Sequence, residues 1–164
     1  MDNAQEKTLM QALLTFAFLL PLPFFRPAER TDQAAWGQLL AAFSERGVTV
    51  NSDHPRCQEP NLYGLYVRGS RTVVVCERGD RSSTLRHEGW HLVQSLCLQG
   101  RPWLSSQQIE QRLSRDDRLE LQTLVQPDRW QREAEARAMA RLRANDYLQE
   151  LNRACTEHLL PQPQ

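Results

Sequence analysis

Two histidines and a glutamate near the middle of the 164-residue chain have the types and spacing of a zinc site. His87-Glu88-Gly89-Trp90-His91 spells HExxH. Residues four apart on a helix lie on the same face, so His87 and His91 can direct their imidazole nitrogens at one Zn²⁺ ion. Glu88 adjoins the first ligand and can take a proton from a zinc-bound water as general base. The pattern therefore predicts hydrolysis by an activated water.

The five-residue pattern alone is weak, because it arises by chance in about one of a few hundred chains of this size. Its context strengthens it. Two of the four histidines fall within the motif, and the segment has the apolar spacing of a helix. The alternative is a pair of surface histidines in a helical protein, with HExxH accidental.

A catalytic zinc needs a third protein ligand and leaves one position open for water. The helical segment 130–140 offers Glu133 and Glu135, which are two residues apart and so point in different directions. Glu133 shares its face with Ala136 and Ala140, whose small side chains allow a close approach to the motif helix. We therefore predict Glu133 as the third ligand, with Glu135 as the rival. A further alternative is that both carboxylates are solvated.

Two more residues are candidates for support around the site. Gln94 lies one turn beyond His91, and Tyr147 shares the face of Glu133 if one helix runs from about 127 to 152. A group that stabilises the transition state is also expected. The sequence offers several without choosing among them: Tyr63, Tyr66, Tyr147 and His158.

The surrounding pattern predicts an α+β fold with a small sheet in the first half of the chain. Residues 62–67 and 72–76 are β-prone and flank a turn, which indicates a hairpin, and 48–50 is a further strand candidate. Helices are expected from Asp32 to Gly47, over 83–99, after a capping box at Ser105 and Gln108, over 116–125 and over 127–152.

Length and charge fit one soluble domain. The formal net charge is zero and the basic residues form no run, so no nucleic-acid partner is expected. We place a single domain at 31–160, after an N-terminal segment and linker at 1–30. Within that segment Leu9–Phe25 is strongly apolar, and its pattern is equally consistent with a signal peptide, a membrane anchor or a buried helix. The localisation of the protein therefore stays undecided between export or membrane association and the cytoplasm.

The four cysteines are compatible with two disulfides in three connectivities, or with four buried thiols. No CxxC pair is present, which argues against a structural zinc knuckle. The positions are Cys57, Cys76, Cys97 and Cys155.

The HExxH motif, followed by a helix carrying Glu133-x-Glu135-Ala136, resembles the gluzincin metallopeptidases. The helix is also similar to the E-x-E-A-N-x-x-A stretch of the ImmA/IrrE-type peptidases, except that Arg137 replaces the Asn. A second resemblance is to the mitochondrial ATP-synthase-assembly metalloprotease family, on the following residues: Val75-Cys76, Thr84-Leu85-Arg86-His87 and Cys97. These resemblances imply a zincin-like fold, a Zn²⁺ cofactor and an edge strand that holds an extended peptide.

The sequence thus favours a zinc peptidase that acts on a peptide or protein substrate. Two alternatives stay open: a zincin-fold metal-binding or interaction protein without turnover, and a membrane-anchored helical protein. Retention of Glu88 argues against the first alternative, because an inactive protein needs no base. Neither the substrate nor the oligomeric state follows from the sequence.

Overall fold

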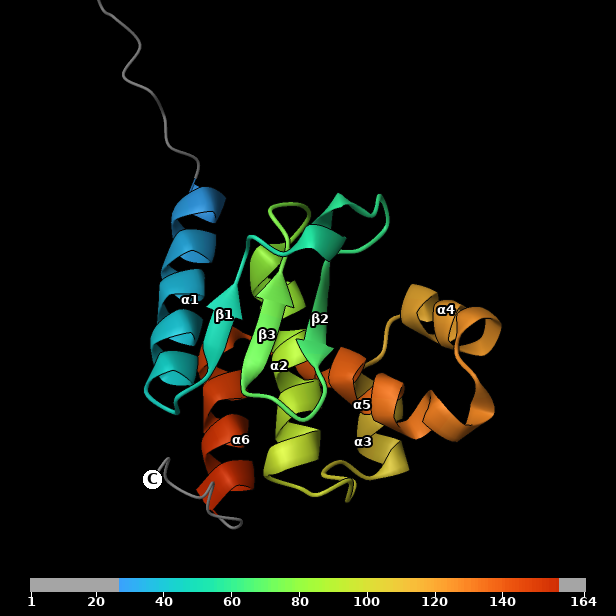
Figure 1. Ribbon diagram of the computed structural model, residues 1–164. Coiled ribbons are helices and arrows are strands. Elements are labelled where there is room, and N and C mark those ends of the chain that lie inside the picture. Colours follow the sequence, from blue (N-terminus) through green and yellow to red (C-terminus); the bar gives the residue numbers. More distant parts are fainter. Residues whose placement is uncertain (1–26, 157–164) are drawn as a thin grey trace, which may run out of the picture.

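The computed structural model describes residues 27–156 and has an α+β architecture, as predicted. Its sheet has the order β1-β3-β2 (Figure 1). The hairpin pairs β2 (Gly64–Val67) antiparallel with β3 (Thr72–Val75), with Tyr66 opposite Val73. The short strand β1 (Thr49–Asn51) runs parallel to β3 on the other side. The hairpin prediction is confirmed, and β2 is left at the edge of the sheet.

The helices surround a central one that carries the HExxH motif. This helix, α2, contacts β2 and β3 of the sheet as well as α1, α5 and α6 (Figure 1). The α-helices of the described residues are α1 (Pro27–Ser44), α2 (Arg81–Leu96), α3 (Ser106–Arg112), α4 (Arg115–Leu124), α5 (Trp130–Ala140) and α6 (Ala144–Thr156). Two 3-10 helices occupy Pro55–Gln58 and Pro127–Arg129.

Local chemistry explains where the site helices begin. The Asp80 side chain accepts a hydrogen bond from the backbone N–H of Ser83 and so caps α2. The predicted capping box of Ser105 and Gln108 is present at the start of α3. The Asp80 cap fixes the start of α2, and the four-residue spacing then puts the two histidines on one face of that helix.

The packing of α1 against α2 depends on a glycine inside the motif. A Cβ on Gly89 would lie 2.2 Å from Cζ of Phe43, so only glycine fits at this position. Trp90 and Tyr147 are fully buried beside this contact, with their ring centroids 5.9 Å apart. The packing of α1 on α2 therefore requires glycine at position 89, the third residue of HExxH.

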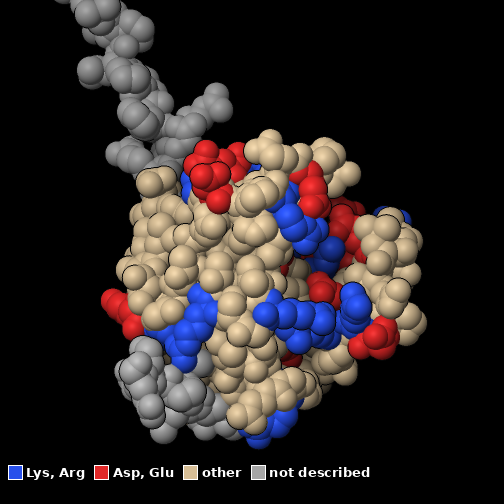
Figure 2. All heavy atoms as spheres, viewed as in Figure 1, with Lys and Arg blue, Asp and Glu red and all other residues tan. Residues whose placement is uncertain are grey.

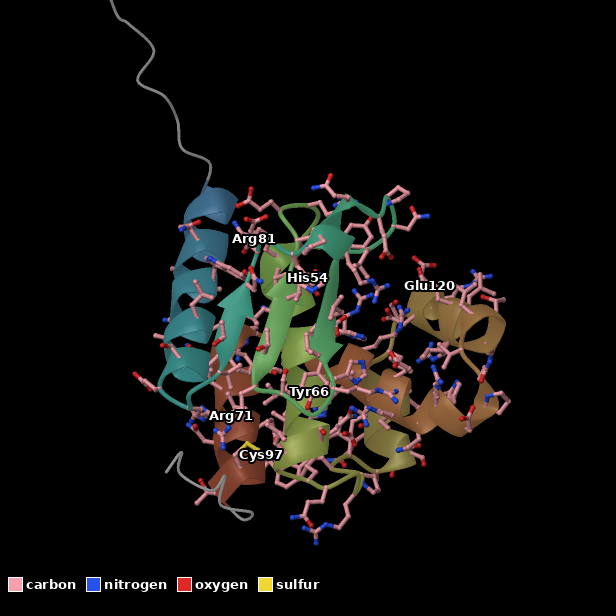
Figure 3. All side chains as sticks on the ribbon, viewed as in Figure 1. His54, Tyr66, Arg71, Arg81, Cys97 and Glu120 are labelled. Atoms are coloured by element: carbon pink, nitrogen blue, oxygen red, sulfur yellow. A yellow bond between two sulfur atoms is a disulfide. The ribbon has the colours of Figure 1, made fainter. Side chains whose placement is uncertain are left out.

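Two disulfides tie the described chain together. Cys57 bonds to Cys76 and Cys97 bonds to Cys155, so none of the four cysteines is free. The second bond joins the end of α2 to α6 (Figure 3). Of the alternatives that the sequence left open, the structure therefore has two disulfides.

Two of the predicted helices differ from the structure by more than a turn. The helix expected over 127–152 is broken, because α5 ends at Ala140 and α6 begins at Ala144. The first helix begins at Pro27, five residues before Asp32, so 27–30 is helical instead of a linker. Proline is favoured in the first turn of a helix, since its missing N–H is not needed there.

The apolar run Leu9–Phe25 lies outside the described residues. Among the helices of residues 27–156, none is both long and apolar enough to span a membrane.

Candidate metal centre

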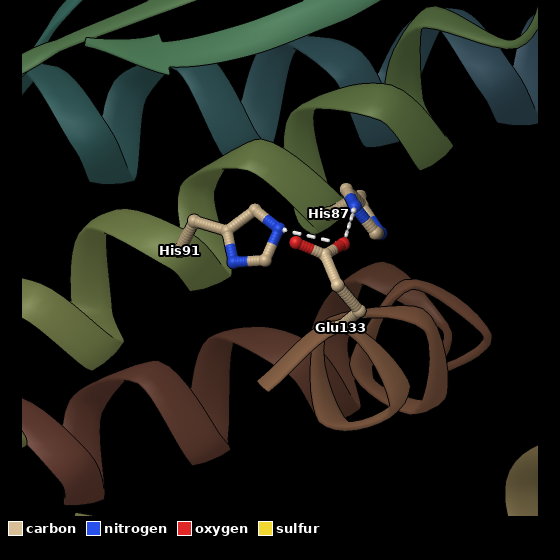
Figure 4. Close-up of side chains that lie close together, drawn as sticks. All are labelled: His87, His91 and Glu133. Carbon is tan, nitrogen blue, oxygen red and sulfur yellow. Dashed lines mark ion pairs between the residues drawn. The ribbon is translucent and has the colours of Figure 1, made fainter. Parts of the chain in front are cut away.

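The structure brings His87, His91 and Glu133 together, from two helices. The Oε2 atom of Glu133 lies 3.6 Å from Nε2 of His87 and 3.3 Å from Nε2 of His91 (Figure 4). One ligand atom from each of the three residues lies within 4.8 Å of the others. The prediction of a cluster able to hold a metal ion is confirmed on this geometry.

The spacing fits a small tetrahedral ion. With metal–ligand bonds of about 2.0–2.1 Å, two ligand atoms of a tetrahedral site are separated by roughly 3.4 Å. The two measured distances to Glu133 bracket this value. Two imidazoles and one carboxylate also form a donor set that leaves a fourth position free. The donor set and the two distances to Glu133 are therefore compatible with a small metal ion held by these three residues.

The three side chains are electrostatically coupled. Burial alone would raise the pKa of Glu133, but hydrogen bonds from His87 and His91 hold that pKa well below its usual range. Burial alone would lower the pKa of His91, but the hydrogen bond and negative charge of Glu133 raise it. The carboxylate is thus ionised and aimed at the histidines, as a ligand must be.

Glu88 lies beside this cluster, against the edge strand. Its Oε2 atom accepts a hydrogen bond of 2.9 Å from the backbone N–H of Tyr66 in β2. A Cβ on Gly64 would lie 3.1 Å from Cγ of Glu88 and 2.6 Å from Cγ2 of Thr84. Glycine at position 64 therefore lets β2 approach α2 closely enough to hold the Glu88 carboxylate.

Glu135, the rival third ligand, is used differently. It is 1% exposed, and each of its oxygens accepts two hydrogen bonds. Oε1 accepts from Nε1 of Trp90 at 2.8 Å and Nε2 of Gln94 at 2.9 Å. Oε2 accepts from the backbone N–H groups of Trp103 at 2.7 Å and Leu104 at 2.9 Å. Glu135 is outside the metal-ligating cluster because four N–H donors already occupy it.

Gln94 contacts His91, which is the supporting position proposed for it from the sequence. Its Oε1 atom lies 2.9 Å from Nδ1 of His91, on the side of the ring away from Glu133. Gln94 is 4% exposed. The sequence signal for this contact was only the one-turn spacing, so its partners could be known only from the fold.

Tyr147 was predicted to support the metal ligands, but its contacts are with core residues. Its ring packs between Phe43 and Trp90, with centroids 6.4 and 5.9 Å away. Its hydroxyl is buried, has no hydrogen-bond partner, and burial raises its pKa. Tyr147 is therefore a core residue by its contacts, and the break before α6 explains why it does not continue the face of Glu133.

The other candidates for stabilising a transition state do not lie together at the site. Tyr66 accepts a hydrogen bond at its hydroxyl from the N–H of Gly69, while Tyr63 is 53% exposed and lines the cavity beside His87. His158 lies outside the described residues. Among the four candidates, Tyr63 is the one that the described structure places at the cavity.

Arg137, which stands where the resembling peptidases have Asn, is directed towards α4. It forms ion pairs with Glu120 at 2.6 Å and with Asp117 at 3.6 Å. Arg141 pairs with Asp117 at 2.8 Å. Figure 3 shows Glu120 on α4, across the cleft from β2. Arg137 therefore forms an ionic link between α5 and α4.

A cavity of about 450 Å³ opens next to the cluster. Figure 2 shows basic and acidic side chains gathered around a recess between β2 and α4. His87 and Glu88 are at this cavity, and its other lining residues are Asn61, Leu62, Tyr63, Gly64, Ser83, Thr84, Asp117, Glu120, Arg137, Ala140 and Arg141. The candidate base and one ligand are therefore accessible from the cleft.

Comparison with known proteins finds no matching family model, no similar curated protein and no similar solved structure. The geometry of the cluster is the observation on which a functional proposal can rest.

Proposed function

We propose that this protein is a zinc-dependent peptidase of the zincin-like type. The observation that carries the proposal is the convergence of His87, His91 and Glu133, with Glu88 beside them at an open cavity. These three residues would hold the ion. When bound, zinc supplies Lewis acidity that polarises a carbonyl and makes water a better nucleophile.

Glu88 is the proposed base. Its carboxylate takes a proton from the attacking water as the oxygen of that water bonds to the carbonyl carbon. When the C–N bond breaks, the same group gives the proton to the departing amine, so the carboxylate is regenerated. The hydrogen bond from Tyr66 orients the carboxylate and leaves its other oxygen for this transfer.

The substrate is proposed to be a peptide or protein in extended conformation. β2 is an edge strand of the sheet and adjoins both Glu88 and the cavity. A peptide can pair with such an edge through backbone hydrogen bonds to groups other than the N–H of Tyr66, which is bonded to Glu88. The two disulfides favour action in an oxidising compartment.

The metal is tested first. We expect one zinc per chain in the purified wild type and none in His91→Ala, measured by elemental analysis with folding checked by circular dichroism. Absence of zinc from the wild type, even after incubation with the metal, would exclude the zinc peptidase.

Turnover is tested separately with Glu88→Gln. This variant should keep the zinc and lose cleavage of an unstructured protein such as casein. If the wild type binds zinc but cleaves no member of a diverse peptide library, the alternative of a metal-binding protein without turnover is favoured.

A further inference from the structure

The polar atoms of Gln94 have partners that fix the orientation of its amide. Nε2 donates to the backbone carbonyl of Arg132 at 3.0 Å and to Oε1 of Glu135 at 2.9 Å. A carbonyl oxygen can only accept a hydrogen bond, so the atom facing Arg132 must be the NH₂ group. The amide oxygen is therefore the atom that lies 2.9 Å from Nδ1 of His91.

This orientation decides which tautomer of His91 is present. The amide oxygen carries no hydrogen, so Nδ1 of His91 must be the donor. In the metal-free protein Nε2 donates to Glu133, and once a metal displaces that proton the neutral ring has its lone pair on Nε2. That nitrogen is the one directed at Glu133, at 3.3 Å (Figure 4). The ring is thus held in the state in which Nε2 can bind a metal.

Glu135 in turn prevents the amide of Gln94 from reversing. A reversed amide would put its oxygen against two acceptors, the carbonyl of Arg132 and the carboxylate of Glu135, at 2.9–3.0 Å. Glu135 is itself held by three further N–H donors: Nε1 of Trp90 and the backbone groups of Trp103 and Leu104. The buried carboxylate of Glu135 therefore anchors the hydrogen bonds that run from Glu135 through Gln94 to His91.

We propose that Gln94 and Glu135 are positioning residues, which act on the metal through His91 without touching it. The inference rests on the proposed function, because it assigns them to the same zinc site. It adds that Glu135 supports, through Gln94, the Nδ1 atom of His91, which is the ring nitrogen that does not face Glu133. His87 has no such support, since none of the described residues forms a hydrogen bond with its Nδ1.

The test compares Gln94→Met with Val93→Ala. Gln94→Met removes the acceptor of His91 at similar side-chain length. Val93→Ala deletes two buried methyl groups from the same helix and leaves the hydrogen bonds among His91, Gln94 and Glu135 intact, so it is a control for loss of buried packing. For each variant we would measure zinc affinity by competition with a chelator, and thermal stability without metal. Cobalt substitution adds an absorption spectrum that reports the ligand geometry.

We expect Gln94→Met to bind zinc about 10–100-fold more weakly, as is typical when a partner of a metal ligand is lost. Its cobalt spectrum should change, whereas Val93→Ala should keep the affinity and spectrum of the wild type despite lower stability. Wild-type affinity in Gln94→Met overturns the positioning role and leaves the zinc site standing. Equal losses of affinity in both variants also overturn it, because they would reflect packing alone.

A measurement on the wild type keeps the test decisive if Gln94→Met does not fold. Long-range ¹H–¹⁵N spectra of the zinc-loaded protein should show His91 with its proton on Nδ1. A proton on Nε2 with Nδ1 bound to the metal overturns the inference. Failure of the wild type to bind zinc excludes the proposed function and this role together, and is distinguished from the other outcomes by the wild-type titration alone.

Discussion

Glu133 and Glu135 are two residues apart on α5 and have opposite environments. The Glu133 side chain is 29% exposed and faces two histidines, whereas Glu135 is 1% exposed and accepts four hydrogen bonds from N–H groups. About half a turn of helix thus separates a candidate ligand from a buried carboxylate, so the two side chains point in different directions.

This contrast predicts different losses in two isosteric variants. Glu133→Gln should weaken zinc binding by more than about a hundredfold, because a charged ligand is lost from the site. Glu135→Gln should lower the free energy of unfolding of the metal-free protein by about 1–3 kcal/mol, since an amide nitrogen would oppose buried N–H donors. Its effect on zinc affinity should be smaller than that of Glu133→Gln, because Glu135 acts only through Gln94 and His91. Isothermal titration with zinc and urea unfolding measure the two effects. Equal zinc affinity in Glu133→Gln and the wild type would rule out Glu133 as the third ligand, and Glu110→Gln, an exposed pair with Arg118, is the control.

Gly89 within the motif should tolerate no side chain. In Gly89→Ala the new Cβ would overlap Phe43, whose ring is fully buried, and we expect a loss of about 1–3 kcal/mol in the free energy of unfolding. A Cβ added to Gly37 in α1 would meet nothing within 4 Å, so Gly37→Ala should be neutral or stabilising by up to about 1 kcal/mol. Thermal unfolding compares the two, and Phe43→Leu should partly rescue Gly89→Ala. A Gly89→Ala protein as stable as Gly37→Ala would contradict the close packing of α1 on α2.

Asp117 pairs with Arg137 and Arg141 where α4 meets α5. We expect its contribution to the free energy of unfolding to depend on pH. Burial alone would raise its pKa, but hydrogen bonds from Arg141 and Ser114 lower that pKa to about 2. In the unfolded chain the pKa is about 3.9. The stabilisation is therefore complete above about pH 5 and is lost as the pH falls towards 2.

Asp117→Asn should accordingly be less stable than the wild type by about 1–2 kcal/mol at pH 7, after allowance for solvent screening. The difference should shrink on acidification to pH 3, as followed by urea unfolding. Asp146→Asn, which breaks an exposed pair with Arg143, is the control and should have little effect. A difference for Asp117→Asn that does not change with pH would show that its charge is not what stabilises the link.

The two disulfides should contribute unequally to stability. The bond between Cys97 and Cys155 spans 58 residues, and the bond between Cys57 and Cys76 spans 19. Closing the longer loop removes more entropy from the unfolded chain, so the paired alanine variants should lose about 4 and about 3 kcal/mol respectively. Thermal unfolding of both double variants tests the order. The reverse order would indicate that local packing at Cys57 and Cys76 outweighs loop length.

Local patterns predicted the hairpin, the motif helix and the capping box because each depends on residues close in sequence. The prediction of one continuous helix over 127–152 was wrong, because the helical spacing of apolar residues gives no sign of the break at 141–143. The prediction that the first helix begins at Asp32 was also wrong, because α1 already includes Pro27. Such boundaries depend on what the helices pack against, which local propensity cannot reveal.

By itself, the sequence determined that His87, Glu88 and His91 share one helical segment, because the four-residue spacing matches the helical repeat. It also favoured Glu133 over its rival Glu135 as the third ligand, because small residues share the face of Glu133. Only the tertiary structure decided between them, since the choice depends on which face of α5 meets α2. The pairing of the cysteines and the partners of Gln94 were decided in the same way, because contacts between residues distant in sequence leave no local pattern.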